Sequence, residues 1–172
     1  LQDAISEKVA RGLAVQLSAR ERERITKRYT GSNEAYQLYQ KGRYFWNKRT
    51  EDGQKKSIAF FEEAINRDPN YALAYAGLAD SYLVQLTLLP PKEVYPKAKQ
   101  AALKALEIDD TLPEPRAALA FATMLFDWDW KTSEREFRHA LDLNPNDGLA
   151  YQRYAVSLAA EGRFGEAIAE AK

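Results

Sequence analysis

A fixed interval between small residues recurs along this chain. Three pairs of alanines stand 15 positions apart: Ala64 with Ala79, Ala105 with Ala120, and Ala140 with Ala155. Each interval holds a short segment rich in Asp, Asn and Pro, which end helices and begin turns, at positions 68–70, 109–110 and 144–146. Three identical intervals indicate a structural repeat in which the turn between successive units has one fixed length.

Further small residues mark where the helices of each unit cross. They are Gly42, Ala79, Ala120 and Ala155 in the first helices, and Ser57, Ala98, Ser133 and Ala167 in the second. Antiparallel helices approach closely only where no bulky side chain intervenes, so a stack of helix pairs needs small residues at its crossings. The interval between the two sets is 15, 19, 13 and 12 residues, which predicts insertions of 3, 7 and 1 residues in the loops within units.

The apolar spacing and the turn residues predict the helices. First helices are expected near 34–48, 72–86, 114–126 and 148–161, and second helices near 53–67, 91–108, 129–143 and 164–172. Pro91 suits the start of a helix, whereas Pro96 is expected to kink that helix or delay it. A further helix is expected at 1–18, followed by a short charged helix to about residue 26.

The charge balance and the lack of cysteine exclude several classes of protein. The 172 residues include 25 basic and 25 acidic ones, and this zero net charge argues against a dedicated binder of nucleic acid or anionic membranes. With no cysteine there is no disulfide framework and no thiolate metal site. The longest apolar run, residues 117–126, is half of what a spanning helix needs, about 20 residues.

The pattern of matched positions resembles the tetratricopeptide repeat family. The fourth unit carries Tyr151, Tyr154-Ala155, Gly162-Arg163-Phe164 and Ala167, and the second carries Leu78-Ala79, Tyr82, Ala98 and Ala105. The resemblance implies an all-α fold, a superhelical solenoid of antiparallel helix pairs, here with an extra N-terminal helix. The expected divisions are 1–30 for the end of an upstream domain, and 34–71, 72–112, 113–147 and 148–172 for four repeats, the last one truncated.

Residues 1–30 are similar to the helix that closes a TolB-like domain in bacterial multidomain signalling proteins. In those proteins a winged-helix DNA-binding domain, an adenylate cyclase or a serine/threonine kinase can come first, and a tetratricopeptide array follows. The chain begins without Met and stops inside a helical pattern. We therefore expect a piece of a larger protein, in which more repeats follow.

The family resemblance implies a partner-binding groove. In such arrays the first helices line a concave face where ligands bind. The corresponding residues here are Tyr39, Arg43, Trp46, Asn47, Asp80, Leu83, Phe121, Met124, Gln152 and Val156. An aromatic residue at helical spacing is more often part of a core, which is the competing interpretation. The helix at 114–126 is apolar almost all round, so we expect Phe121, Met124 and Leu125 to be covered by the N-terminal helix, a second copy or a peptide.

Other candidate sites have simpler interpretations. His139 is the only histidine and has no readable catalytic partners, and the acidic pairs suit helix starts and turns. Basic residues at 20–28 alternate with Glu21 and Glu23, which fits a solvated helix. Trp130 has core spacing, and Trp128 is expected to pack over the loop end. No metal, cofactor or catalytic residue is predicted.

One well-known activity of the family is not expected. Arrays that bind the acidic C-terminal tails of chaperones hold the terminal carboxylate with Lys, Asn and Arg. The corresponding positions here carry Tyr39, Arg43, Gly77, Glu114 and Ala118. Only Arg43 could serve, and Glu114 would repel a carboxylate.

Three hypotheses for function follow. The first is a non-enzymatic module that binds a protein or peptide in a groove, as the sensory or scaffolding arm of a bacterial signalling or transcription-regulatory protein. The second is a small-molecule sensor, and the third is an oligomerisation arm that associates through an open C-terminal edge. The expected compartment is the cytoplasm, or the periplasm if a membrane span precedes this piece.

Overall fold

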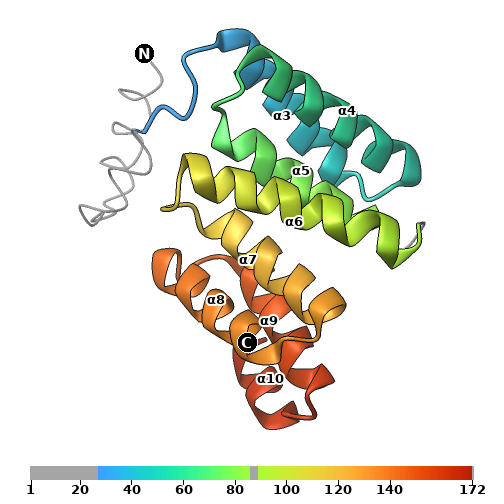
Figure 1. Cartoon of the computed structure of the whole chain (residues 1–172), viewed down its shortest axis with the longest axis vertical. Helices are drawn as coiled ribbons and strands as arrows, with labels where there is room; N and C mark the ends of the chain where they lie inside the picture. The colour runs from blue at the N-terminus through green and yellow to red at the C-terminus, as the bar shows by residue number, and fades with distance from the viewer. Residues whose placement is uncertain (1–26, 86–88, 172) are drawn as a thin grey trace, which may run out of the picture. The chain divides into compact units, whose positions relative to one another are not determined.

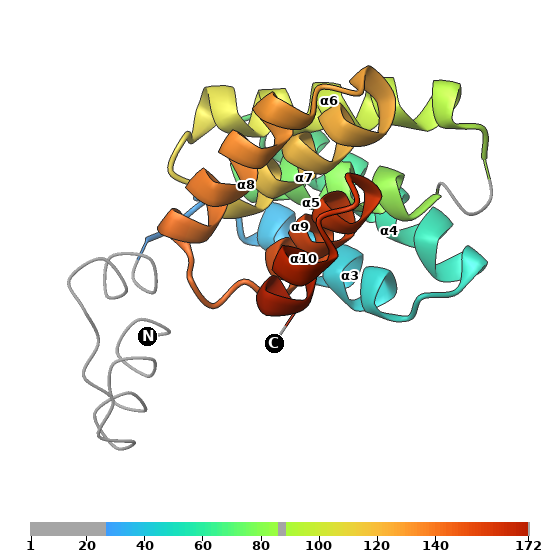
Figure 2. The same cartoon turned by 90° about the horizontal axis from the view of Figure 1, so that it is seen from below.

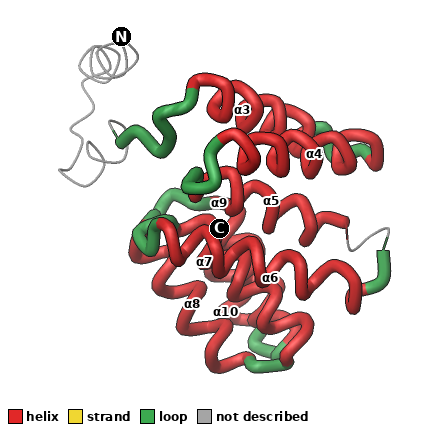
Figure 3. Tube along the Cα trace, turned by 45° about the horizontal axis from the view of Figure 1, so that its top comes forward, coloured by secondary structure: helices red, strands yellow, loops and turns green. Residues whose placement is uncertain are grey.

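Four antiparallel helix pairs follow one another from Ser32 onward (Figures 1 and 3). The computed structural model describes residues 27–85 and 89–171 and divides the chain into two units, Leu1–Gly31 and Ser32–Lys172, of which the second holds the array. Its first helices are α3 (Asn33–Asn47), α5 (Ala72–Val84), α7 (Pro113–Ala122) and α9 (Gly148–Ala160). Its second helices are α4 (Glu51–Arg67), α6 (Pro91–Ile108), α8 (Trp130–Leu143) and α10 (Phe164–Glu170).

These bounds confirm the predicted helices of the array to within a few residues, and α6 spans the predicted 91–108. Pro96 lies inside α6 and does not delay its start at Pro91. The predicted helices at 1–18 and up to residue 26, together with the part of the sequence that resembles the end of a TolB-like domain, lie outside the described residues apart from positions 27–30.

Successive helices of the array pack against each other in two layers. Each second helix packs against its own first helix, and α4, α6 and α8 also pack against the first helix of the next unit. The first helices also pack on one another in the order α3, α5, α7 and α9, so they form a continuous layer. Figure 2 views the array from its C-terminal end, with α9 and α10 nearest the reader. We call the outer side of this layer, which the second helices do not cover, the first-helix face.

The turns between units share one hydrogen-bonding pattern, which explains their constant length. The side chains of Asp68, Asp109 and Asn144 accept a hydrogen bond from the backbone N–H two residues on, at 3.0, 3.2 and 3.3 Å. All three residues cap the preceding helix in an extended conformation. Asp and Asn form such turns with their own backbone, so the second joint keeps its geometry although it lacks the proline of the other two.

The tightest crossing is built around Phe61, whose ring is fully buried between α3 and α5. A Cβ atom on Gly42 of α3 would lie 2.6 Å from Cε1 of this ring, and one on Gly77 of α5 would lie 2.5 Å from Cζ. Both positions therefore need glycine for close approach. Phe61 belongs to a core that continues through α5 and α6 into α7, and a second core joins α7 to α10.

The three insertions are absorbed in different ways. In unit one α4 begins early, at Glu51, with the Thr50 hydroxyl accepting from the N–H of Gly53 at 3.1 Å. In unit two three of the seven extra residues lie in the connection between α5 and α6, and the other four lengthen α6 at its start. In unit three the single extra residue is taken up by a π-helical turn, Thr123–Asp127, whose i→i+5 hydrogen bonds hold one more residue per turn than an α-helix.

Trp128 ends that π-helical turn with a left-handed backbone, φ 59°, and its side chain is 70% exposed. The prediction that Trp128 packs over the loop end is therefore wrong. Its ring meets Trp130 edge to face, with centroids 5.9 Å apart, while the rest of the indole lies in solvent. The left-handed turn reverses the chain into α8 within two residues, and this direction carries the side chain outward.

Candidate functional site on the first-helix face

A buried ion pair joins helices that are two units apart. Asp80 of α5 is 2% exposed, and its Oδ1 accepts a hydrogen bond from Nη1 of Arg153 in α9 at 2.7 Å. Arg153 is 7% exposed, and its guanidinium also lies over the ring of Phe121 in α7, 5.6 Å from the centroid. Arg43 of α3 approaches the other carboxylate oxygen more loosely, at 3.9 Å. All four first helices therefore contribute to one cluster.

The repeat register explains most of this cluster. Arg43, Asp80 and Phe121 each follow the small residue that marks the helix crossing, so they occupy equivalent positions in three consecutive units. Arg153 lies three positions before its own equivalent, Val156. The places in units two and three that correspond to Arg153 hold Gly77 and Ala118. At Gly77 the small size is required by the Phe61 ring, which would lie 2.5 Å from an added Cβ.

Arg43 and one further arginine, Arg49, pack on the same indole at the end of α3. Trp46 is 5% exposed, with the Arg43 guanidinium carbon 4.8 Å and the Arg49 guanidinium carbon 3.7 Å from its ring. Arg49 follows α3 with φ 53°, a left-handed conformation that is uncommon for a residue other than glycine. That backbone reverses the chain toward α4, and the Arg49 side chain returns over the helix end onto Trp46.

The pKa shifts in this region reflect burial and the surrounding charges. Burial lowers the pKa of Arg49, with the cations Arg153 and Arg43 acting in the same direction and Asp80 opposing them. Burial also raises the pKa of Tyr39 to about 12, against the influence of Arg43. The phenol therefore stays neutral at physiological pH, and its ring lies against Phe61 and Tyr71 at centroid distances of 5.7 and 5.3 Å.

The predicted groove residues divide by exposure. Trp46, Asp80, Leu83 and Met124 are buried, Tyr39, Arg43 and Phe121 are half-buried, and Asn47, Gln152 and Val156 are exposed. The structure brings Arg43, Trp46 and Asp80 together at the N-terminal part of the face. Gln152 instead lines a hollow between α9 and α10 with Tyr151 and Val156.

Met124 needs no separate segment to cover it, whereas for the half-buried Phe121 and Leu125 such a covering segment stays a prediction. Met124 is 2% exposed, and Phe121 and Leu125 pack against the core formed by α4 to α7. Neighbouring helices of the array cover this apolar helix, because α7 lies between α5 on one side and α9 on the other.

Two participating residues, Arg49 and Arg153, were not among the predicted ones. Arg49 belongs to an inter-helix loop whose conformation is not readable from helical periodicity. Arg153 lies away from the position in its own unit that is equivalent to Arg43, Asp80 and Phe121, so the repeat register does not mark it.

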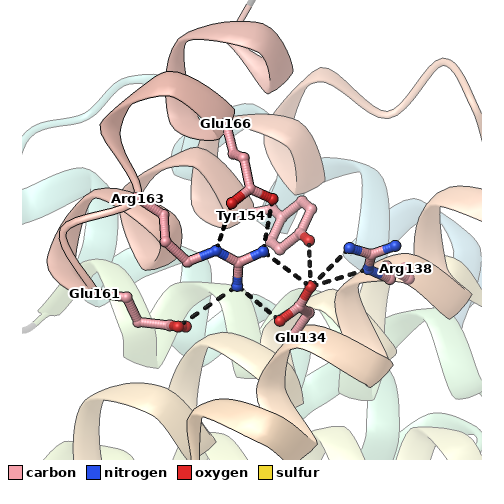
Figure 4. A network of polar contacts seen from close by, with 6 residues as sticks. All are labelled: Glu134, Arg138, Tyr154, Glu161, Arg163 and Glu166. Atoms are coloured by element: carbon pink, nitrogen blue, oxygen red, sulfur yellow. Dashed lines mark hydrogen bonds and ion pairs between the residues drawn. The ribbon is translucent and has the colours of Figure 1, made fainter.

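A second polar cluster joins units three and four (Figure 4). Glu134 of α8 accepts hydrogen bonds from Arg163 at 2.8 Å, from Arg138 at 2.7 Å and from the Tyr154 hydroxyl at 3.2 Å. Arg163 also donates a hydrogen bond to Glu166 at 2.7 Å. The hydrogen bond from Arg163 is the largest cause that lowers the pKa of Glu134 to about 2. Glu134 therefore stays ionised and serves as a structural anchor rather than a general acid.

The described residues hold no group of three or more His, Asp or Glu side chains arranged for a metal ion. His139 lies exposed on α8. Within the same residues, none of the helices combines the length and the apolar character that crossing a bilayer requires.

Comparison with proteins of known structure identifies the fold. The structure is similar to the Arabidopsis OM64 TPR domain, with TM-score 0.59 and 21% identity over 74% of this chain and 96% of that one. It is equally similar, at TM-score 0.59 and 14% identity over 79% of this chain and 99% of the other, to the first TPR of Spaghetti (RPAP3) bound to the HSP90 peptide SRMEEVD. The described array has the tetratricopeptide repeat fold.

A third tetratricopeptide structure, of YrrB, is described as having an unusual peptide-binding site. It matches at TM-score 0.55 and 22% identity over 89% of this chain and 71% of that chain. By sequence, the chain is similar to the transcriptional regulator HilA of Salmonella typhimurium, 24% identical over 133 residues and 76% of its own length. The match spans about a quarter of HilA, 24% of its length. No protein-family model matches the chain.

Proposed function

We propose that this tetratricopeptide array is a non-catalytic module that binds a peptide or a partner domain on its first-helix face. The observation that carries the proposal is the cluster of cationic and aromatic side chains to which all four first helices contribute. Arginine and aromatic residues are the types that most often dominate binding energy at protein interfaces. The fold supports the same function, because two of the similar structures have an HSP90 or an HSP70 peptide bound.

The proposed binding surface is rigid before the partner arrives. Tyr39 and Phe121 pack on the core behind them, and the Asp80–Arg153 pair fixes α5 relative to α9. A surface that is already ordered loses little conformational entropy on binding, so more of the contact energy appears as affinity. Arg43 and Asn47 lie one helical turn apart and present their polar ends beside this surface.

We infer further that the array is the sensory or scaffolding arm of a bacterial signalling or transcription-regulatory protein. The similarity to HilA and the resemblance of residues 1–30 to the end of a TolB-like domain support this context. The partner, in this proposal, would report to an output domain elsewhere in the protein.

Peptide selection tests the binding function. A random dodecapeptide library displayed on phage is selected on the purified chain, and the affinities of recovered peptides are measured by fluorescence anisotropy. Asn47→Trp, which adds bulk at the exposed end of α3, should weaken binding at least tenfold, about 1.4 kcal/mol. Asn66→Trp adds the same bulk on the exposed side of α4 and should leave affinity unchanged. Failure to recover any peptide, or equal loss in both variants, would count against the first-helix face.

Self-association is a second candidate function, favoured by the apolar edge at α9 and α10. Phe164 and Ile168 are 65% and 60% exposed there, and Val156 is 48% exposed. Ala171, which follows α10, is exposed, whereas the equivalent positions in units one to three are fully buried, namely Phe61, Ala102 and Phe137. Sedimentation velocity should show a dimer that Ile168→Lys converts to a monomer, and a monomeric wild type would exclude this function.

A small-molecule sensor is the remaining alternative. A thermal-shift screen with metabolites tests it, because a ligand that binds only the folded state raises the melting temperature by mass action.

A further inference from the structure

The end of α3 holds two cations against one buried indole. The Arg43 guanidinium lies 4.8 Å and the Arg49 guanidinium 3.7 Å from the Trp46 ring, which is 5% exposed. We call these three residues the arginine platform. Stacking on an aromatic face limits the rotamers of a guanidinium, so its N–H groups are already oriented for an incoming acceptor.

The charges around the platform do not balance. Asp80 is the one carboxylate within ion-pair distance of Arg43 and Arg153 among the described residues, and it acts on Arg49 together with these two cations. Arg153 donates a hydrogen bond from Nη1 to Oδ1 of that carboxylate at 2.7 Å, whereas Nη1 of Arg43 lies 3.9 Å from Oδ2. Arg49 has no carboxylate within ion-pair distance in the part of the chain that the structure describes. The local excess is therefore positive, although the whole chain is neutral.

The two platform cations, Arg43 with one long ion pair and Arg49 with none among the described residues, are accessible from outside. The Arg43 side chain is 35% exposed, and Arg49 is exposed. Asp80 cannot move out to neutralise them, because it is 2% exposed and held by Arg153. An external carboxylate would therefore meet two oriented guanidinium groups on a partly desolvated surface, where charge-assisted hydrogen bonds are strongest.

We propose that the arginine platform binds an acidic side chain, Asp or Glu, within the partner peptide. The inference rests on the proposed peptide-binding function and adds the chemistry of the partner. The platform shares only Arg43 with the positions that hold a terminal carboxylate in arrays that bind chaperone tails, because the other four are Tyr39, Gly77, Glu114 and Ala118 here. An internal acidic residue, rather than the end of a chain, is the group that the platform selects.

The experiment compares peptides that differ by one charge. Dodecapeptides are selected from the random library, and each strong binder is synthesised with acetylated and amidated ends, as the parent and with each Asp or Glu changed to Asn or Gln. Affinities are measured on the wild type, on Arg43→Gln and Arg49→Gln, and on the matched control Arg135→Gln. Arg135 is an exposed arginine of α8, on a second helix, with its side chain 68% exposed.

The selected peptides should be enriched in Asp and Glu, and one acidic position should account for about a tenfold change in affinity when it is neutralised. Arg43→Gln and Arg49→Gln should each reduce the affinity for the parent peptide by about the same factor and leave the affinity for its neutral analogue unchanged. Arg135→Gln should behave as wild type, and high salt should reduce the difference between the acidic and neutral peptides.

Three results would overturn the inference. Peptides that bind the first-helix face without acidic enrichment, and with equal affinity in all four proteins, would leave the proposed function standing and refute this one. Recovery of no peptide at all would refute both. Binding of a labelled oligothymidine that is lost in Arg43→Gln and Arg49→Gln, without peptide binding, would assign the platform to phosphates instead.

Discussion

The close contact of Phe61 with two glycines makes the replacement of one of them a sharp test of the packing. In Gly77→Ala the new methyl carbon would lie 2.5 Å from Cζ and 2.6 Å from Cε1 of the Phe61 ring. Carbon atoms in contact are normally about 3.5–4.0 Å apart. The same edge of the ring already touches Gly42, where an added Cβ would be 2.6 Å from Cε1, so the ring cannot retreat freely.

Two opposing contributions set the magnitude. Overpacking a well-filled core costs about 1–3 kcal/mol, and a displacement of roughly 1 Å against a fully buried ring belongs at the upper end. Replacing glycine by alanine inside a helix gains about 1 kcal/mol in helix propensity. We therefore expect Gly77→Ala to lower the free energy of unfolding by about 2 kcal/mol.

A double-mutant cycle separates the clash from the propensity. In a Phe61→Leu background the ring edge is gone, and Gly77→Ala should become neutral or stabilising by up to about 1 kcal/mol, so the sign of the effect reverses. Gly165→Ala in α10 is the matched control, because a Cβ there would have no neighbour within 4 Å and only the propensity gain remains.

Urea unfolding of the four proteins in the cycle, and of the control, is followed by circular dichroism at the helical minimum. The midpoints and slopes give the change in unfolding free energy. If Gly77→Ala is at least as stable as the wild type, or if Phe61→Leu does not change the sign of its effect, the proposed packing of Phe61 between α3 and α5 is wrong.

Three further predictions concern charge and backbone strain. Asp80→Asn leaves Arg153 buried without a counter-charge and should cost about 3–5 kcal/mol in unfolding free energy, measured by urea titration; a loss under 1 kcal/mol would contradict the buried pair. The pKa of Glu134 is lowered from 4.5 to about 2, so its ionised carboxylate stabilises the folded state fully above pH 4.5, and this stabilisation is lost as the pH falls toward 2. In Glu134→Gln the melting temperature should therefore depend less on pH over that range than it does in the wild type. Trp128→Gly should be more stable than Trp128→Ala by about 1 kcal/mol in thermal melts, because only glycine adopts φ 59° without strain.

The helices of the array could be predicted because their causes are local. The turns at Asp68, Asp109 and Asn144 depend on side chains two residues from the groups they bind, and sequence spacing captures this. The small residues at the helix crossings could be counted for the same reason. The one-residue insertion in unit three was visible as an interval of 13, but its form, a π-helical turn, depends on how the helix end packs.

The candidate site was less accessible to prediction because its contacts depend on how the units stack. Asp80 is a charged residue, which normally indicates an exposed position, yet Arg153 buries it from 73 positions away. The family resemblance implies that Asp80 and Leu83 line the groove, but both are buried. The position of Arg49 follows from a left-handed backbone after α3, and no periodicity indicates such a conformation.

The bond between Asp80 and Arg153 also bears on how the array unfolds. In a repeat protein each unit normally contacts only its neighbours, so the ends can fray one unit at a time and the middle survives. Here an ion pair joins unit two directly to unit four, although unit three lies between them in the repeat order. Unfolding of the last helix pair would leave Asp80 of α5 buried without its Arg153 counter-ion. It would therefore also destabilise unit two, nearer the N-terminal end. Units two to four should therefore melt as a single cooperative block, and hydrogen exchange in α5 and α9 should proceed with matched opening free energies.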